Sequence, residues 1–314
     1  MKKLSVLLAM ALIVATVFGN NNILTAKAEQ QTTNENHGVY TYDIDTGTVI
    51  YTPDSVETST ISIHSTENNT PAYVPEGLSI DPPSNILPAT IFNNNWSEIN
   101  PATGGQYRNT VYLNIRTTNG WYRGTGFMIG PAAVATCGHC LYDTDYGSNP
   151  WAESIEVIPA MANDSYPYGS AFAKGLTVSS GWSQNGNEEY DWGIIRMRSN
   201  LGDNVGRLGL RWQSNSYNGT SVDVNGYPGI VNGVEKHTMY RAYGTVTSSS
   251  TKMLYSTNIN NIGGMSGGPM YIFSSQFGYQ AIAFTRGENP SFNAYVRIDE
   301  GLFNKFSSYI DQRV

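Results

Sequence analysis

Hydrophobic residues in most of this chain occur in short runs separated by turns, a pattern typical of β-strands. Beyond about residue 85, apolar or alternating stretches of four or five residues are bounded by Gly, Asn and Ser. Strands are predicted at residues 111–115, 126–129, 154–158, 221–225 and 281–284. Residues 300–309 differ, because Leu302 and Phe306 fall on one stripe at helical spacing. The pattern predicts an all-β domain with one helix at its C-terminal end.

The first 28 residues have the features of a secretory signal peptide. Two lysines precede an apolar run over residues 4–18, and Ala26-Lys27-Ala28 has the small-x-small form of a signal-peptidase site. A membrane anchor is the alternative, but the run is shorter than the roughly 20 apolar residues that a spanning helix needs. No later stretch is apolar enough to cross a bilayer. We therefore expect a secreted, extracellular protein from which residues 1–28 are removed.

Residues 29–85 are rich in Asn, Thr, Glu, Ser and Pro, with short alternating pieces only at 39–42 and 60–63. This composition predicts a propeptide or a linker that lies outside the core. A disordered spacer with no role in latency is the alternative. The remaining residues, 86–314, are enough for one two-lobed β domain.

Composition and charge exclude several classes of function. The net charge is −7 and only 14% of the residues are charged, so the chain has no basic footprint for nucleic acid or an anionic membrane. It has no repeat at the periods of solenoids or propellers and no H-E-x-x-H zinc motif. We expect a monomer without nucleic-acid or membrane partners, metal or cofactor.

One serine lies in a glycine-rich string, Gly263-Gly264-Met265-Ser266-Gly267-Gly268-Pro269. Such glycines let the backbone bend sharply and approach a ligand closely. The amides of Gly264 and Ser266 could then point together at an oxyanion, as acyl transfer requires. An ordinary Gly-rich turn is the alternative. The G-x-S-x-G elbow of α/β-hydrolases does not fit, because that fold needs a histidine after the serine and none follows His237.

Four histidines are candidates for the base that would activate this serine. His37 and His64 lie in the segment that we expect to be removed. His139 follows an apolar stretch and is expected at the end of a buried strand, whereas His237 lies in a polar, hairpin-like run. We therefore favour His139 as the general base.

A carboxylate must fix the tautomer of that imidazole and stabilise its charge. The aspartates between base and nucleophile are Asp143, Asp145, Asp164, Asp191, Asp203 and Asp223. Asp191 opens an apolar strand at 191–197, which would draw it toward the core, while the others lie in turns or alternating stretches. Asp191 is the best candidate, although an aspartate in a turn before a strand would look the same.

The chain order His139, Asp191, Ser266 is that of chymotrypsin-like serine endopeptidases. The block Thr-Cys-Gly-His-Cys at 136–140 resembles the sequence around that family's base, and residues 191–195 and 264–269 resemble its Asp strand and nucleophile loop.

Within the family, residues 165–169 and 226–229 and the onset Asn85-Ile86-Leu87-Pro88 resemble the bacterial glutamyl endopeptidase branch. The resemblance implies two six-stranded β-barrels with the triad in the cleft between them and processing near Asn85 and Ile86. It also implies hydrolysis of protein substrates through an acyl-enzyme.

The expected substrate pocket departs from this branch. Asn261 and Phe284 occupy the positions where the resemblance implies a Thr and a His that hold a substrate carboxylate, so a Glu preference is doubtful. Arg286 could supply a positive charge instead, since guanidinium and carboxylate pair well, or it could be a surface residue. An apolar preference with Phe284 in the pocket, beside Thr285, is equally open.

Two further positions differ from relatives. Met265 stands where the resemblance implies, for digestive relatives, an Asp that binds the new N-terminus, so propeptide removal must act by another route. Freeing a blocked cleft and completing the specificity pocket with the new amine are two hypotheses for this route. Cys137 and Cys140 flank the histidine, and the partner that Cys140 has in many relatives is replaced by Gly124. A strained local disulfide and two free thiols are both open, while thioredoxin-like exchange lacks its βαβ setting.

Two alternative functions stay open. A catalytically silent secreted binding protein could have the same fold, although it would often have lost a triad residue. An esterase would use the same acyl chemistry and differ only in its substrate.

Overall fold

The computed structural model describes residues 38–54, 65–79, 95–100, 102–289 and 291–314, all within the structural unit 35–314. The expected signal peptide, the alternating piece at 60–63 and the expected processing point near Asn85 and Ile86 lie outside the described residues. No helix in the described part is long and apolar enough to cross a membrane.

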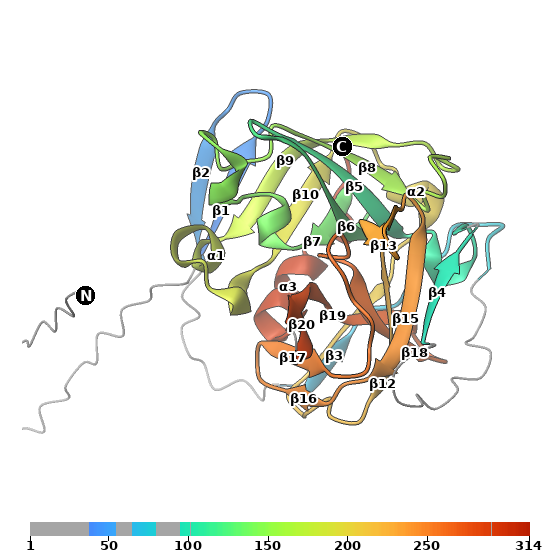
Figure 1. The fold of residues 1–314 in the computed structure, drawn as a ribbon. Coiled ribbons are helices and arrows are strands. Elements are labelled where there is room, and N and C mark those ends of the chain that lie inside the picture. Colours follow the sequence, from blue (N-terminus) through green and yellow to red (C-terminus); the bar gives the residue numbers. More distant parts are fainter. Residues whose placement is uncertain (1–37, 55–64, 80–94, 101, 290) are drawn as a thin grey trace, which may run out of the picture. The chain divides into compact units, whose positions relative to one another are not determined.

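Six strands form a closed barrel in the first lobe (Figure 1). They are β5 (Thr110–Thr117), β6 (Gly120–Gly130), β7 (Ala133–Thr136), β8 (Ser154–Pro159), β9 (Ala171–Ser179) and β10 (Gly193–Met197). The barrel closes because β10 pairs antiparallel with both β7 and β9. Residues 111, 113 and 115 of β5 are buried, as expected for a strand whose alternate side chains face a barrel interior.

A ten-stranded sheet forms the second lobe, in the order β16-β17-β20-β19-β18-β12-β15-β4, with β11 joined to β19 and β3 to β11. These strands are β3 (Glu67–Asn69), β4 (Trp96–Ile99), β11 (Gly209–Gln213), β12 (Ser221–Gly226), β15 (Met239–Thr245), β16 (Ser248–Ser249), β17 (Met253–Ser256), β18 (Pro269–Ser274), β19 (Gly278–Asn289) and β20 (Phe292–Arg297). A separate hairpin joins β13 (Ile230–Val231) to β14 (Val234–Glu235). Within the described residues no pairing joins the ends of this sheet, β16 and β4, so the second lobe is a sheet where a closed barrel was expected.

Helices are few and short. The C-terminal helix predicted at 300–309 is α3 (Glu300–Ser307), which begins after Asp299, whose side chain accepts a hydrogen bond from the Leu302 amide. Two others are α1 (Ser180–Asn185) and α2 (Gly202–Val205). Single 3₁₀ turns are η1 (Gly105–Tyr107), η2 (Gly138–Cys140), η3 (Thr144–Tyr146) and η4 (Glu188–Tyr190). All five predicted strands lie within strands of the structure, which confirms the all-β prediction.

The polar N-terminal segment contributes strands to both lobes. β1 (Gly38–Asp43) and β2 (Val49–Pro53) form a hairpin, and β1 pairs with β9 of the barrel, beside which Figure 1 shows it in blue. β3 pairs with β11 of the second lobe. Val39 is only 6% exposed, and Tyr40 and Tyr42 pack against the core. The expectation that the described part of residues 29–85 stays outside the core is therefore wrong, because Val39 on one face of β1 is buried and Tyr40 and Tyr42 on the other face pack against the core.

Candidate active site

His139 and Asp191 are brought together at the ends of two paired strands. β7 leads through Cys137 into the turn η2, which carries His139, and Asp191 lies between η4 and β10. His139 Nδ1 lies 2.7 Å from Asp191 Oδ2, and the His139 amide donates to Asp191 Oδ1 at 2.9 Å. Asp191 is fully buried. One carboxylate thus holds both the ring and the backbone of His139, which leaves Nε2 as the proton acceptor of the neutral ring.

The surroundings of His139 set its basicity. Burial acts to lower the pKa of His139, but the negative charge of Asp191 and its hydrogen bond, with a contribution from Cys140, raise that pKa well above its usual value. The Tyr146 hydroxyl donates to the His139 carbonyl at 2.7 Å and fixes the backbone from the other side. The ring is therefore oriented before any substrate arrives.

His237, the other candidate base, lies elsewhere. Its Nδ1 is 2.5 Å from Asp164 Oδ1, and that carboxylate is largely exposed. A cavity of about 510 Å³ adjoins this pair, but neither Ser266 nor His139 lines it. The two histidines thus differ in the carboxylate that each contacts. The partner of His139 is fully buried and the partner of His237 is largely exposed, in line with the polar context of His237 in the sequence.

The serine loop is pinned in a shape that only glycine permits at Gly264 and Gly267. Their φ angles are +99° and +84°. A Cβ at Gly264 would lie 2.6 Å from the Tyr227 carbonyl oxygen, and one at Gly267 would lie 2.1 Å from the Thr125 carbonyl oxygen. The loop therefore packs against neighbouring backbone with no room for side chains at these two positions.

Two amides of this loop are free to bind an anion. The Gly263 carbonyl accepts from the Gly229 amide at 2.8 Å, and the Met265 carbonyl accepts from the Gly268 amide at 2.9 Å. In a trans peptide the N–H points opposite to the carbonyl, so the Gly264 and Ser266 amides point away from these partners. Among the hydrogen bonds of the described residues neither amide has an acceptor. This geometry suits an oxyanion hole.

Thr125 of β6 joins the serine loop to the strand that leads to His139. Its amide donates to the Ser266 carbonyl at 2.8 Å and its hydroxyl to the Gly264 carbonyl at 2.9 Å. Its own carbonyl accepts from the Thr136 hydroxyl at 2.7 Å. Cys140, next to His139, places Sγ 3.9 Å from the Ser266 carbonyl oxygen. The backbone at Ser266 therefore lies close to the residue that follows His139. The sequence offered no signal for this role of Thr125 beyond its position between two glycines.

Both cysteines are free, buried thiols. Cys137 Sγ donates to the Thr285 carbonyl at 3.0 Å, and burial raises the pKa of this thiol well above its usual value. A Cβ at Gly124 would lie 2.9 Å from Cys140 Sγ, as expected if Gly124 replaces a cysteine that pairs there in relatives. The Cys137 sulfur and the His139 and Asp191 ligand atoms lie within 4.8 Å of one another. These three residues are the hydrogen-bonded pair of His139 and Asp191 and the neighbouring buried thiol of Cys137.

The residues expected in the substrate pocket have varied surroundings. Phe284 is fully buried and packs on Phe127 and Phe306 in the core. Asn261 and Thr285 are almost fully buried, and each has a side-chain oxygen without a partner.

Arg286 forms ion pairs with two carboxylates. Its Nη2 lies 2.9 Å from Glu188 Oε1, and its Nε lies 3.5 Å from Asp191 Oδ2. The guanidinium therefore acts on the carboxylate that holds His139, a role that the sequence did not reveal, because Glu188 and Arg286 are far apart along the chain.

A cavity of about 490 Å³ is lined in part by Gly264, although neither Ser266 nor His139 lines it. Its other lining residues are Arg123, Gly229, Ile230, Glu235, Ile262 and Gly263. A substrate segment could lie in this cavity beside the oxyanion hole.

The pH dependence of hydrolysis should report the raised pKa of His139. Only neutral His139 can accept a proton, so we expect kcat/KM to rise with pH through an apparent pKa above the usual histidine value of about 6.5. Because the folded-state pKa is raised, protonated His139 also stabilises the fold below the unfolded-state pKa, and this contribution is lost as pH rises through the folded-state pKa. The pH profile is checked by measuring kcat/KM for a peptide substrate at about ten pH values between 5 and 10.

Arg286 provides a control for this profile. Replacing the guanidinium in Arg286→Gln leaves the charge of Asp191 less compensated and should move the apparent pKa further upward, whereas Arg286→Lys should move it less. A profile that is flat across the acid range would contradict the role of His139 as the base.

Comparisons with known proteins place this chain in a family. The sequence profile of the Trypsin family matches residues 97–298. The chain is 33% identical over 222 residues to the "Extracellular metalloprotease" of Bacillus subtilis (strain 168), covering 69% of this chain and 68% of that protein. It is 40% identical over 152 residues to the "Glutamyl endopeptidase" of Bacillus licheniformis, covering 48% of this chain and 46% of that protein.

Two solved structures are similar in fold. One is a Glu endopeptidase in complex with MPD, with a TM-score of 0.61 and 25% identity over 70% of this chain and 97% of that one. The other is the protease Anisep from Arthrobacter nicotinovorans, with a TM-score of 0.55 and 24% identity over 68% of this chain and 99% of that one.

Proposed function

We propose, because this chain belongs to the trypsin family of serine endopeptidases, that His139, Asp191 and Ser266 are its catalytic triad. The chain is a chymotrypsin-like serine-type endopeptidase related to bacterial glutamyl endopeptidases, as the sequence resemblance implied. The observation that carries the proposed triad is the two-point attachment of His139 to the buried Asp191, next to the backbone of Ser266.

Each group has one task in the proposed reaction. His139 Nε2 takes the proton of the Ser266 hydroxyl as its oxygen attacks the scissile carbonyl carbon. The Gly264 and Ser266 amides stabilise the resulting oxyanion, and the Asp191 carboxylate stabilises the imidazolium. His139 then protonates the leaving amine, the acyl-enzyme forms on Ser266, and water attacks it by the same route in reverse.

We further propose that residues 1–28 direct secretion and that a cut near Asn85 and Ile86 matures the chain. The composition of residues 1–28 supports the first statement, and the resemblance of the sequence at residues 85–88 supports the second. Hydrolysis of proteins follows from the family, while the residue preferred before the scissile bond is a separate question.

A neutral residue before the scissile bond is our proposal for specificity. Asn261 offers an amide, and Arg286 already pairs with Glu188 and Asp191, which leaves its charge less available to a substrate carboxylate. Mass spectrometry of peptides released from a denatured protein mixture tests this directly. Cleavage mainly after Glu would contradict it.

A fluorophosphonate probe tests the triad itself. We expect the mature wild-type enzyme to be labelled at Ser266 and the Ser266→Ala variant to remain unlabelled, because only an activated serine reacts with the probe. The same preparations are assayed on a peptide and on the matching ester. Absence of labelling, together with no turnover of either substrate, would favour a silent binding protein, and labelling with turnover of the ester alone would favour an esterase.

A further inference from the structure

The described part of the N-terminal segment, residues 38–54 and 65–79, is called the strap here because it pairs with both lobes. Strand β1 extends the barrel through β9, and β3 extends the second sheet through β11. An isolated bridge between Tyr73 and Arg207 continues the second contact, and the Arg207 guanidinium lies 5.5 Å from the centre of the Tyr73 ring. Composition predicted a linker, but the contacts are those of sheet strands.

The strap completes an edge that the barrel leaves open. β8 pairs with β9 only at Ala171 and Phe172, whereas β1 pairs with residues 175–179 of the same strand. Tyr42 of β1 stacks on Trp151, with ring centres 5.1 Å apart. Without β1, half of a barrel strand would present unpaired N–H and C=O groups, which proteins usually cover.

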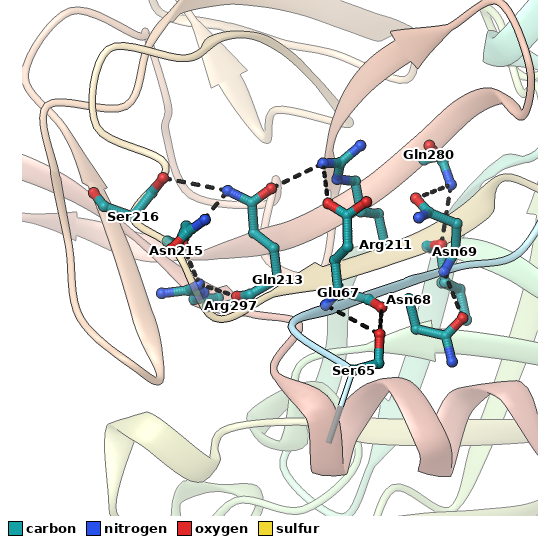
Figure 2. A network of polar contacts seen from close by, with 11 residues as sticks. Ser65, Glu67, Asn68, Asn69, Arg211, Gln213, Asn215, Ser216, Gln280 and Arg297 are labelled. Atoms are coloured by element: carbon teal, nitrogen blue, oxygen red, sulfur yellow. Dashed lines mark hydrogen bonds and ion pairs between the residues drawn. The ribbon is translucent and has the colours of Figure 1, made fainter. Parts of the chain in front are cut away.

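In the second lobe the strap satisfies a buried amide. Gln280 of β19 is fully buried. Its Nε2 donates to Asn69 Oδ1 at 3.1 Å and to the Thr70 and Leu210 carbonyls at 3.2 Å each. Figure 2 shows this contact beside the ion pair between Glu67 and Arg211. Two of the three acceptors belong to the strap, and a buried donor that loses its acceptors is costly.

Two glycines of the protease domain lie where the strap backbone approaches too closely for a side chain. A Cβ at Gly209 would lie 2.3 Å from the Thr70 carbonyl oxygen, and its nearest neighbours all belong to strap residues 70–72. A Cβ at Gly206 would lie 2.3 Å from the Tyr73 carbonyl oxygen. The domain therefore has glycines where the strap backbone approaches most closely, as expected of two surfaces that fit each other.

The strap avoids the catalytic groups. Among the hydrogen bonds and ion pairs of the described residues, none joins it to His139, Asp191, Ser266 or Gly264. No strap residue lines the cavity beside Gly264. The described part of the strap therefore makes none of the contacts that hold the proposed catalytic groups.

We propose that the strap is a permanent part of the protease, held by strand pairing on β9 and β11 after the chain is cut near Asn85 and Ile86. The cut chain is then a complex of two fragments, and the N-terminal fragment is retained as a structural subunit. This inference rests on the proposed maturation cut for its biological meaning. Its test supplies an artificial cut, so that failure of the strap and failure of the catalytic assignment give different results.

The experiment uses the full chain with Ser266→Ala, so that self-cleavage plays no part. A recognition sequence for an added site-specific protease is placed within residues 80–94. After cleavage the protein is passed over a size-exclusion column at low micromolar concentration, and each peak is analysed by mass spectrometry. We expect the strap fragment to co-elute with the domain in equal amounts and to separate only in denaturant.

Gly209→Ala sharpens the test, because its Cβ would clash only with strap atoms. We expect the strap fragment to bind this variant at least about tenfold more weakly. Gly104→Ala, whose Cβ would meet nothing within 4 Å, should retain it fully. Tyr42→Ala alters the strap alone and should also weaken retention. Separation of the fragment from the unsubstituted domain under native conditions would overturn the proposal, as would equal retention by Gly209→Ala.

Discussion

Asp191→Asn should lower kcat for peptide hydrolysis about 10⁴-fold while leaving the fold intact. Asparagine keeps the shape of the side chain, but its amide group can present N–H to His139 Nδ1 and so favour the tautomer with the proton on Nε2. That ring cannot accept the proton of Ser266. The charge that raises the pKa of His139 is removed as well. Initial rates on a chromogenic peptide, with melting temperature as the check on folding, measure the effect.

Asp223→Asn is the matched control. Asp223 is also a buried aspartate between base and nucleophile, and it pairs with Arg241 at 2.6 Å. Its loss should reduce stability and leave the turnover of the folded protein within a few-fold of the parent. Equal losses of kcat in the two variants would argue against Asp191 as the third triad member.

Gly267→Ala should destabilise the protein by about 3–5 kcal/mol. The φ of +84° is strained for alanine, and the new Cβ would lie 2.1 Å from the Thr125 carbonyl oxygen and 2.2 Å from Thr136 Oγ1. Relief requires the serine loop to move away from β6 and β7. Urea unfolding in the Ser266→Ala background, which prevents self-digestion, gives the free energy of unfolding.

Gly219→Ala separates the two causes of this loss. Its φ is +78°, but a Cβ there would meet nothing within 4 Å. It should therefore show only the backbone cost of about 1–2 kcal/mol. If the two variants lose the same stability, the tight packing under Ser266 is not what requires glycine at position 267.

Local patterns predicted the strands and the candidate triad, because these depend on short-range signals. The apolar strand that follows Asp191 and the glycines around Ser266 can each be recognised from a few consecutive residues. The family's chain order implied that these residues meet. The pairing of β7 with β10 places Thr136 opposite Gly193 and so brings His139 and Asp191 together, while the Thr125 amide of β6 holds the Ser266 carbonyl.

Contacts between distant residues could not be predicted in this way. Arg286 looked like a candidate for substrate binding, yet its partners Glu188 and Asp191 lie almost a hundred positions earlier. Phe284 looked like a candidate for lining the substrate pocket, but its contacts with Phe127 and Phe306 place it in the core. The strap was misjudged because its composition is polar, while its affinity for the domain comes from main-chain pairing, which composition does not record.

The Gly263 carbonyl is held by the Gly229 amide and the Gly264 carbonyl by the Thr125 hydroxyl, in a chain that still carries its N-terminal segment. In the proposed mechanism, the two N–H groups that would receive the tetrahedral oxygen are therefore oriented before any cut. The proposed cut near Asn85 and Ile86 would not be needed to create them.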